Sequence, residues 1–474
     1  MKRLTNIMQG FLGTLTLVGL VVALILTLEG SHKETKPASH AFQSPIETPT
    51  ESFNPPRATS TPQATLRPTS TRPPEPPTRT PTPEPTPAPP TPTPDPLPTL
   101  IPGAETLLYV TTGERGPEIY RVQLDQTAHM IASPCHANTP MLWGGRVYVS
   151  GLHPSPDGRL VAVSWVYGEG GTFISILDVS DGTLTSPFGE DVTIDQRVEF
   201  LDWSPAGDQL LVVGGIDNPD LGGKAWLLDP ASGRYEPVEL SQASDGRQIT
   251  SASFSPDGQA IVYAKSDCFQ CGSDVWRIFI GQQGEKQLLL QDAIHRIEDV
   301  SWSPDGRYIA FTQWYETTDG REFATGDLWV MDPRGDARRR LSPVTTGYYG
   351  PFTPVWSPDG LSIAYVLDEE PSSERQASEP SFNVYVVNVA TEEIRQLTHF
   401  QNTQVLGPIF SPDGSMLVVV AALAGVSDQF EPWLVTADGR GLRRLDERAN
   451  PTMNTGAAIP AIAWLPEFSP GDER

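Results

Sequence analysis

The chain has 474 residues, and its 58 Asp and Glu outnumber its 33 Lys and Arg, which gives a formal net charge of −25 at pH 7. Residues 1–104 hold 8 Lys and Arg against 7 Asp and Glu, so residues 105–474 hold the remaining 25 against 51. This acidic excess argues against nucleic-acid binding and against adhesion to anionic lipid headgroups, because both need a basic surface.

The first 30 residues predict a membrane anchor. Lys2 and Arg3 precede a mostly apolar run from Ile7 to Leu28, and about 20 such residues cross a hydrocarbon core of ~30 Å. Basic residues ahead of the run favour a cytoplasmic N-terminus, which places everything after Glu29 outside the cytoplasm. A cleaved signal peptide stays open as an alternative, although the run continues to Leu28 without a small-residue exit. We expect a single-pass protein of the cell membrane.

Residues 31–103 predict a disordered Pro/Thr-rich stalk. From Pro73 to Pro98 the sequence nearly alternates Pro with Thr, Glu and Ala, a composition that forms neither helix nor sheet and stays in extended polyproline II. The stalk would lift the following domain off the membrane. The many Thr beside Pro suggest O-glycosylation as a hypothesis, with a plain spacer as the alternative.

A short turn motif recurs six times in the next segment. Trp302-Ser303-Pro304-Asp305-Gly306 is the clearest copy, and the others start at Ser155, Ser204, Ser255, Ser357 and Ser411, with Ala206 replacing Asp in the second. Pro presets the backbone of a turn, Asp hydrogen-bonds nearby backbone, and Gly accepts a positive φ. Because apolar segments flank each copy, we predict β-hairpins in which the Asp residues serve the turn rather than catalysis.

The motif repeats at steps of 49, 51, 48, 54 and 54 residues, with about four strand-sized segments (a, b, c, d) in each period. This period is typical of propeller blades. Residues 105–133 match b, c and d without a hairpin before them, and Ala461–Pro466 matches a solitary strand a. We therefore predict an all-β, seven-bladed β-propeller over residues 104–466, six blades intact and one closed by the C-terminal strand, with a tail at 467–474.

The pattern of an apolar strand, Trp or Phe, Ser-Pro-Asp-Gly and a second apolar strand resembles the WD40-like (PD40) repeat of the TolB family. The resemblance covers roughly residues 105–466 and weakens at Pro154 and Ala206. It implies the propeller fold and says little of function, because related blades occur in periplasmic binding proteins and in accessory domains of peptidases and lyases. One Trp per blade (Trp203, Trp302, Trp356 and Trp464) is interpreted as core between blades.

Three cysteines are present, and Cys268 and Cys271 fall in the predicted b–c loop of the fourth blade. Outside the cell we expect a local disulfide between them, with free thiols or a metal or redox role as alternatives. Cys135 is left over.

Strand order places the a–b and c–d turns on one face of the ring and the longer b–c and d–a loops on the other. Long, varied loops are where binding residues tend to lie. This loop-rich face carries aromatic residues that we expect to be exposed and to bind a partner: Trp143, Tyr167, Trp314, Tyr315, Tyr348 and Tyr349.

Enzyme signatures are sparse. The chain has no Gly-x-Ser-x-Gly motif, and we expect no cofactor and no metal. The weakest candidate is a metal site formed by His136, His295 and His399, which all fall in or near d–a loops. We expect a monomeric, non-catalytic scaffolding or binding module for a protein or cell-envelope glycan partner. The alternative is a hydrolase or lyase acting on cell-surface polysaccharide or peptide, toward which carboxylates with a raised pKa at the channel mouth would point. A membrane sensor is a third option.

Overall fold

The computed structural model describes residues 106–113, 116–123, 129–132, 147–167, 171–187, 198–214, 224–238, 240, 248–266, 272–280, 285–315, 325–342, 352–368, 382–401, 403–422, 429–445, 453–454 and 461–466. The predicted anchor, the predicted stalk and all three cysteines lie outside these residues. Among the described residues, none belongs to a helix with the length and apolarity that a membrane crossing requires.

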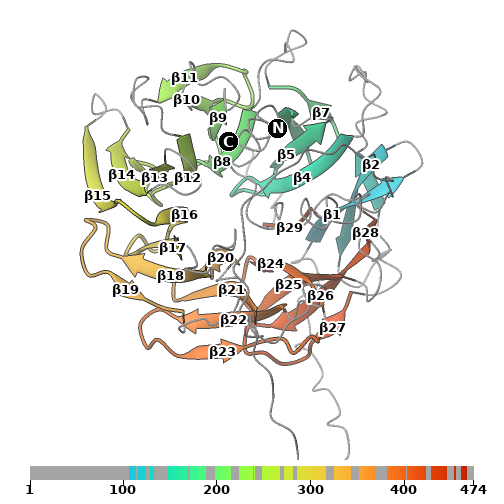
Figure 1. Cartoon of the computed structure of the whole chain (residues 1–474). Helices are drawn as coiled ribbons and strands as arrows, with labels where there is room; N and C mark the ends of the chain where they lie inside the picture. Colours follow the sequence, from blue (N-terminus) through green and yellow to red (C-terminus); the bar gives the residue numbers. More distant parts are fainter. Residues whose placement is uncertain are drawn as a thin grey trace, which may run out of the picture. The chain divides into compact units, whose positions relative to one another are not determined.

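The described strands form seven antiparallel sheets, which are arranged as blades around a common centre (Figure 1). The first three blades are β29 (Ile462–Leu465), β1 (Thr106–Gly113), β2 (Gly116–Gln123) and β3 (His129–Ala132); β4 (Val147–Pro154), β5 (Leu160–Tyr167), β6 (Gly171–Asp178) and β7 (Leu184–Thr185); and β8 (Val198–Trp203), β9 (Leu210–Gly214), β10 (Lys224–Leu228) and β11 (Tyr235–Val238).

The other four blades continue in chain order, and the last has one additional strand. They are β12 (Gln248–Phe254), β13 (Ala260–Ser266), β14 (Ser273–Phe279) and β15 (Lys286–Asp292); β16 (Arg296–Trp302), β17 (Ile309–Tyr315), β18 (Thr325–Met331) and β19 (Arg339–Arg340); β20 (Phe352–Trp356), β21 (Ser362–Asp368), β22 (Phe382–Asn388) and β23 (Ile394–Gln396); and β24 (Val405–Phe410), β25 (Met416–Ala422), β26 (Gln429–Thr436), β27 (Arg443–Arg444) and β28 (Met453–Asn454).

Blade 1 is built from both ends of the described region, as the sequence predicts. Strand β29 pairs with β1, and Trp464 stands opposite Leu107 in that register. The pairing continues where the Val110 N–H donates to the Ala461 carbonyl at 3.0 Å. The seven-bladed ring and its closure by the C-terminal strand are confirmed.

The Ser-Pro-Asp-Gly motifs form the a–b hairpins. The Ser303 hydroxyl donates to Asp305 Oδ1 at 2.7 Å, and the Arg307 N–H donates to the same oxygen at 3.0 Å. Gly306 has a φ of 72°, which a residue with a Cβ rarely adopts. Equivalent Ser-to-Asp hydrogen bonds occur in the copies at Ser155, Ser255, Ser357 and Ser411. The Asp residues are therefore turn residues, as predicted.

The exceptional copy at Ser204 keeps the same interaction with a different partner. Ala206 has no carboxylate, and the Ser204 hydroxyl instead donates to Asp208 Oδ1 at 2.7 Å. The Gln209 N–H donates to Ser204 Oγ at 2.9 Å, as in the other hairpins. The turn thus recovers its carboxylate from two residues further along the chain.

The core lies between the blades, where the repeated Trp residues pack as predicted. Trp203, Trp356 and Trp464 are buried, and Trp302 is partly buried against the core of blades 4 and 5. Three of the indoles also bond the preceding blade: Trp203 Nε1 donates to the His153 carbonyl at 2.8 Å, Trp356 Nε1 to Ser301 Oγ at 3.2 Å and Trp464 Nε1 to the Ile409 carbonyl at 3.1 Å.

The strand bounds place the long connections on one face of the ring. The b–c and d–a connections include residues 133–146, 186–197, 215–223, 316–324 and 369–381, whereas each a–b connection is the tight hairpin described above. One d–a connection is short: three residues join β15 to β16.

Candidate functional site

Strand a of each blade, which is β29 in blade 1, lies nearest the centre of the ring (Figure 1). On four successive inner strands, β4, β8, β12 and β16, polar residues recur, and we call these strands the polar wall. Its polar residues include Ser150, His153, Glu199, Asp202, Thr250, Ser251, Ser253, Arg296, Glu298, Asp299 and Ser301. The other three inner strands, β20, β24 and β29, form what we call the apolar wall. Thr353 is the one polar residue on these three strands. The ring therefore has two chemically different inner sides.

Polar side chains of the polar wall join one inner strand to the next. Asp202 Oδ2 accepts a hydrogen bond from the Phe254 N–H of blade 4 at 2.8 Å, and its Oδ1 accepts one from the Trp203 N–H at 2.9 Å. At the following junction, Ser251 Oγ accepts from the Val300 N–H at 3.1 Å. Burial raises the pKa of Asp202 to about 6, and its hydrogen bonds limit the rise. The Asp202 carboxylate thus holds two blades together.

Asp299 ends a chain of side-chain hydrogen bonds that begins in the core. Trp314 Nε1–H donates to Thr312 Oγ1 at 3.2 Å, and the Thr312 hydroxyl donates to Asp299 Oδ2 at 2.9 Å. Asp299 lies in a β-bulge of β16 and has a φ of 52°. Burial, and next the charge of Glu298, raise the pKa of Asp299 to about 7, while Thr312 and Arg296 oppose the rise. The Thr312 hydrogen bond and the Arg296 charge thus only partly offset the effect of burial on this carboxyl group.

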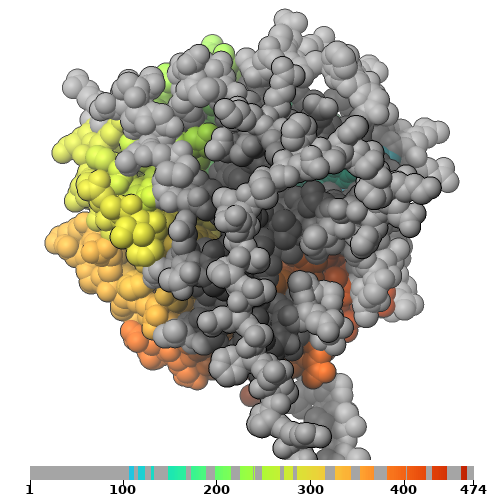
Figure 2. Space-filling view, in the orientation of Figure 1, coloured from blue at the N-terminus to red at the C-terminus, as the bar shows by residue number. Residues whose placement is uncertain are grey.

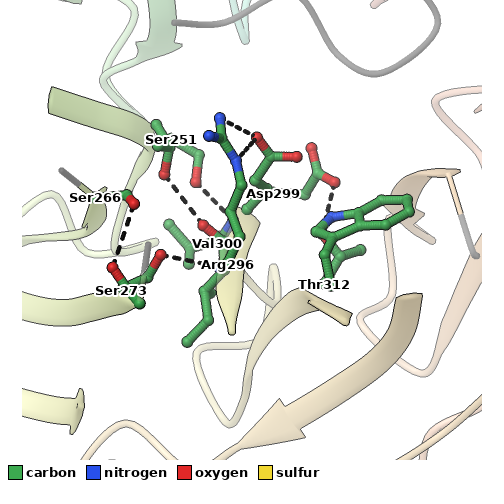
Figure 3. Close-up of polar contacts among 12 residues, drawn as sticks. Ser251, Ser266, Ser273, Arg296, Asp299, Val300 and Thr312 are labelled. Atoms are coloured by element: carbon green, nitrogen blue, oxygen red, sulfur yellow. Dashed lines mark hydrogen bonds and ion pairs between the residues drawn. The ribbon is translucent and has the colours of Figure 1, made fainter. Parts of the chain in front are cut away.

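The charge of Arg296 is neutralised within the same strand. Its guanidinium is buried, with Nε 2.7 Å and a terminal nitrogen 2.6 Å from Glu298 Oε1. The backbone is held as well, because the Ile297 N–H donates to Ser273 Oγ of blade 4 at 3.0 Å. Figure 3 shows Ser273, Arg296 and Asp299 gathered around this stretch of β16. The β12–β16 junction is thus a dense and largely self-satisfied polar network.

Glu199 is an acid of the polar wall whose buried carboxylate is not fully hydrogen-bonded. Within the described residues its Oε2 is sealed from solvent and has no hydrogen-bond partner, and burial raises its pKa to about 7. His153, on the neighbouring inner strand, stacks on Phe200 with the ring centroids 4.0 Å apart, and its Nε2 lies 3.1 Å from Ser164 Oγ. Burial lowers the pKa of His153 to about 4, so this imidazole stays neutral at pH 7.

The predicted histidine site is only partly within the structure. His136 lies outside the described residues, and His399 is exposed after β23. His295 Nδ1 lies 2.9 Å from Asp292 Oδ2 in the connection between β15 and β16. Within the described ranges, no group of three or more His, Cys, Asp or Glu side chains is placed to hold a metal ion.

Of the six aromatic residues predicted to bind, Trp314 is corrected by the structure. Its side chain is 4% exposed and packs in a core cluster whose other members belong to blades 6 and 7. A Cβ added to Gly326 would lie 2.9 Å from its ring, so the indole is enclosed on that side. The expectation of an exposed ring is wrong here because β17 continues through Tyr315, so that Trp314 belongs to a strand covered by neighbouring blades.

For the other five residues, the binding role stays a prediction. Tyr167 and Tyr315 are the last residues of β5 and β17, which places them at the loop-rich face. Trp143, Tyr348 and Tyr349 lie outside the described residues, as does the predicted Cys268–Cys271 pair.

Sequence reasoning missed the acids of the polar wall, although a signal for them exists. Glu199 and Glu298 each stand four residues before the Trp of their blade, Trp203 and Trp302. The equivalent residue of β20 is Phe352. A comparison of equivalent positions around the ring, rather than a search for motifs, would have shown that two blades carry an acid where β20 and β24 carry the apolar Phe352 and Leu406.

Comparisons with known proteins agree with the repeat pattern. No family model matches the chain. A segment of 215 residues is 28% identical to YuxL, an uncharacterized peptidase of Bacillus subtilis (strain 168), and covers 39% of this chain and 31% of that protein. A segment of 117 residues is 29% identical to the Tol-Pal system protein TolB of Francisella tularensis subsp. holarctica (strain OSU18), and covers 24% of this chain and 22% of that protein. Part of the propeller is thus similar in sequence to TolB.

Solved structures match this propeller at low sequence identity. A prolyl endopeptidase matches with a TM-score of 0.50 at 11% identity, over 72% of this chain and 50% of that chain. TolB from Acinetobacter baumannii matches with a TM-score of 0.41 at 17% identity, over 76% of this chain and 82% of that chain. The chain spans less than a third of the length of the curated relatives named above. The predicted resemblance to TolB-like propellers is confirmed at the level of the repeat and the fold.

Proposed function

We propose that this chain is a non-catalytic binding propeller, anchored in the cell membrane by its N-terminal segment and exposed outside the cytoplasm. A protein or cell-envelope glycan partner would bind its loop-rich face. The asymmetry of the connections carries the proposal: one face consists of tight hairpins fixed by Ser–Asp hydrogen bonds, and the long loops are on the other. The polar wall supports it, because Asp202 and Arg296 serve contacts within the fold.

The binding face can be tested in cells that make the full chain. A photo-crosslinking amino acid would replace Tyr315, at the loop-rich end of β17, or Leu361, which is 44% exposed in a hairpin on the opposite face. We expect a discrete adduct from position 315 and none from position 361. Adducts from 361 alone, or from neither position, would contradict the proposed face.

The anchor needs a separate measurement. Membranes washed with alkaline carbonate should retain the full chain, and protease added to intact cells or spheroplasts should remove the propeller. Recovery of the chain in the soluble fraction would contradict the anchor without affecting the binding face, because binding is assigned to the propeller alone.

An enzyme is the second candidate, and one observation favours it. Glu199 and Asp299 lie on inner strands of the ring, and burial raises the pKa of each carboxyl group to about 7, a suitable value for general acid or base catalysis near neutral pH. Incubation with a panel of cell-envelope polysaccharides and peptides tests this. Turnover that disappears in both Glu199→Gln and Asp299→Asn, with a pH profile centred near 7, would establish the enzyme over the binding module.

A further inference from the structure

The three-residue connection between β15 and β16, on the loop-rich face, is held by hydrogen bonds to Asp292. Asp292 Oδ1 accepts hydrogen bonds from the Ile294 N–H at 3.0 Å and the His295 N–H at 2.9 Å. Its Oδ2 lies 2.9 Å from His295 Nδ1 and accepts from Gln313 Nε2 at 2.6 Å. One carboxylate therefore fixes the backbone of the turn and attaches it to β17.

The charge state of Asp292 suits this role. Partial burial alone would raise its pKa, but the hydrogen bonds from His295 and Ile294 outweigh burial and hold the pKa below its usual value. The carboxylate thus stays ionised at neutral pH, where its hydrogen bonds are strongest.

This turn presents an apolar side chain to solvent. Ile294 is 74% exposed, more than any other large hydrophobic side chain in the described residues, where the next is Tyr235 at 53%. The turn itself does not call for Ile, because Gly, Asn, Asp and Ser are the residues that turns favour. Single exposed apolar side chains are common on protein surfaces. Ile294 differs in that its backbone is already fixed in one position.

We propose that Ile294 is an anchor that inserts into an apolar pocket of a protein partner, a step that deepens the proposed function and rests on it. A fixed backbone reduces the ordering that binding would otherwise require, and a few residues buried in pockets near the centre of an interface carry most of its binding energy. A branched aliphatic side chain lacks the flat ring on which a sugar stacks, so the chemistry fits a protein rather than a glycan. The acidic chain favours a partner that is basic around its pocket.

The test uses the full chain in cells, with a photo-crosslinking amino acid in place of the exposed Gln291, beside the turn. We expect one discrete protein adduct. Adding Ile294→Asp should reduce its yield about tenfold or more, as loss of a central anchor does. The matched control is Leu361→Asp, which places the same charge on an exposed aliphatic site of the opposite face and should leave the yield unchanged.

A second variant separates the anchor from its support. Asp292→Ala keeps Ile294 but releases the turn, so the adduct should weaken several-fold while the thermal unfolding temperature shows that the ring is intact. An adduct that survives Ile294→Asp would overturn the inference, as would adducts that form from position 315 but not from 291, which would leave the proposed function standing. Absence of adducts from both positions would overturn the two together.

Discussion

The polar and apolar walls both join neighbouring blades, but they do so with different chemistry. At the residue before the blade aromatic, the polar wall has Asp202, whose carboxylate bonds the next inner strand. The apolar wall has Val355 and Ile409 there, which bring no side-chain acceptor, and Ile409 instead offers its backbone carbonyl to Trp464. Both walls close the ring. Only the polar wall introduces ionisable side chains, and burial raises the pKa of its Glu199, Asp202 and Asp299. The two sides should therefore respond differently to substitution and to pH.

The largest effect is expected at Trp314, which connects Asp299 of the polar wall to a core cluster otherwise formed by blades 6 and 7. Trp314→Ala should lower the free energy of unfolding by about 3–5 kcal/mol, because it leaves a large cavity. Trp314→Phe keeps most of the packing and should cost less. Denaturant unfolding of both variants measures this. Wild-type stability in Trp314→Ala would mean that the indole is a surface residue after all.

Next is Asp202, whose loss leaves the Phe254 and Trp203 N–H groups without their acceptor. Asp202→Ala should destabilise the ring by about 2–3 kcal/mol, since unsatisfied buried donors are costly. Val355→Ala, at the same position of the apolar wall, is the control and should cost about 1 kcal/mol. Equal losses in the two variants would show that the Asp202 hydrogen bonds add nothing beyond packing.

The pH dependence of stability should also distinguish the polar wall from the apolar wall. Burial raises the pKa of Glu199 to about 7, so its contribution to stability is fully present below its unfolded pKa, near 4, and is lost as the pH rises through 7. Glu199→Gln should therefore stabilise the chain by roughly 3–4 kcal/mol at pH 8 and change little at pH 4. Thermal unfolding across this range measures the difference.

Asp413 should show the opposite pH dependence of stability in the same experiment. Hydrogen bonds from Ser411 and Ser415 outweigh burial and hold its pKa below the usual value, so its contribution is present at neutral pH and is lost as the pH falls through the folded pKa. Asp413→Asn should destabilise the chain at pH 8 and less so in acid. A Glu199→Gln variant with the same pH dependence as the wild type would exclude Glu199 as the buried acid.

The smallest effect concerns the exceptional hairpin of blade 3. Asp208→Ala should cost about 1 kcal/mol by removing the acceptor of the Ser204 hydroxyl. Adding Ala206→Asp to that variant restores the usual Ser-Pro-Asp-Gly motif and should recover most of the loss. Thermal unfolding of the single and double variants tests the pair. No recovery would show that Asp208 acts other than through this hydrogen bond.

The repeat could be predicted because a turn motif constrains its neighbours locally. Ser303, Asp305 and Gly306 interact within a few residues, so their spacing alone indicated hairpins, and six hairpins indicated blades. The closing strand was also predictable, since Trp464 matches the aromatic position of the other blades.

The inner wall and the burial of Trp314 depend on contacts between blades, which local patterns do not encode. In a propeller both faces of strand b are covered by neighbours, so the alternation that usually separates buried from exposed residues disappears. Trp314 therefore looked like a loop residue although it is core. In the same way, Asp299 acquires its role from a bulge and from Thr312, thirteen residues away.

The pairing of β29 with β1 constrains how the chain reaches its native state. Synthesis delivers β1 first and β29 last, so blade 1 must wait, with one sheet edge open, until nearly the whole propeller has been made. Contacts between residues so distant in sequence form slowly, and open edges invite pairing with other chains. Ring closure should thus be the final step of folding, and the interval before it should be when the chain is most prone to aggregation.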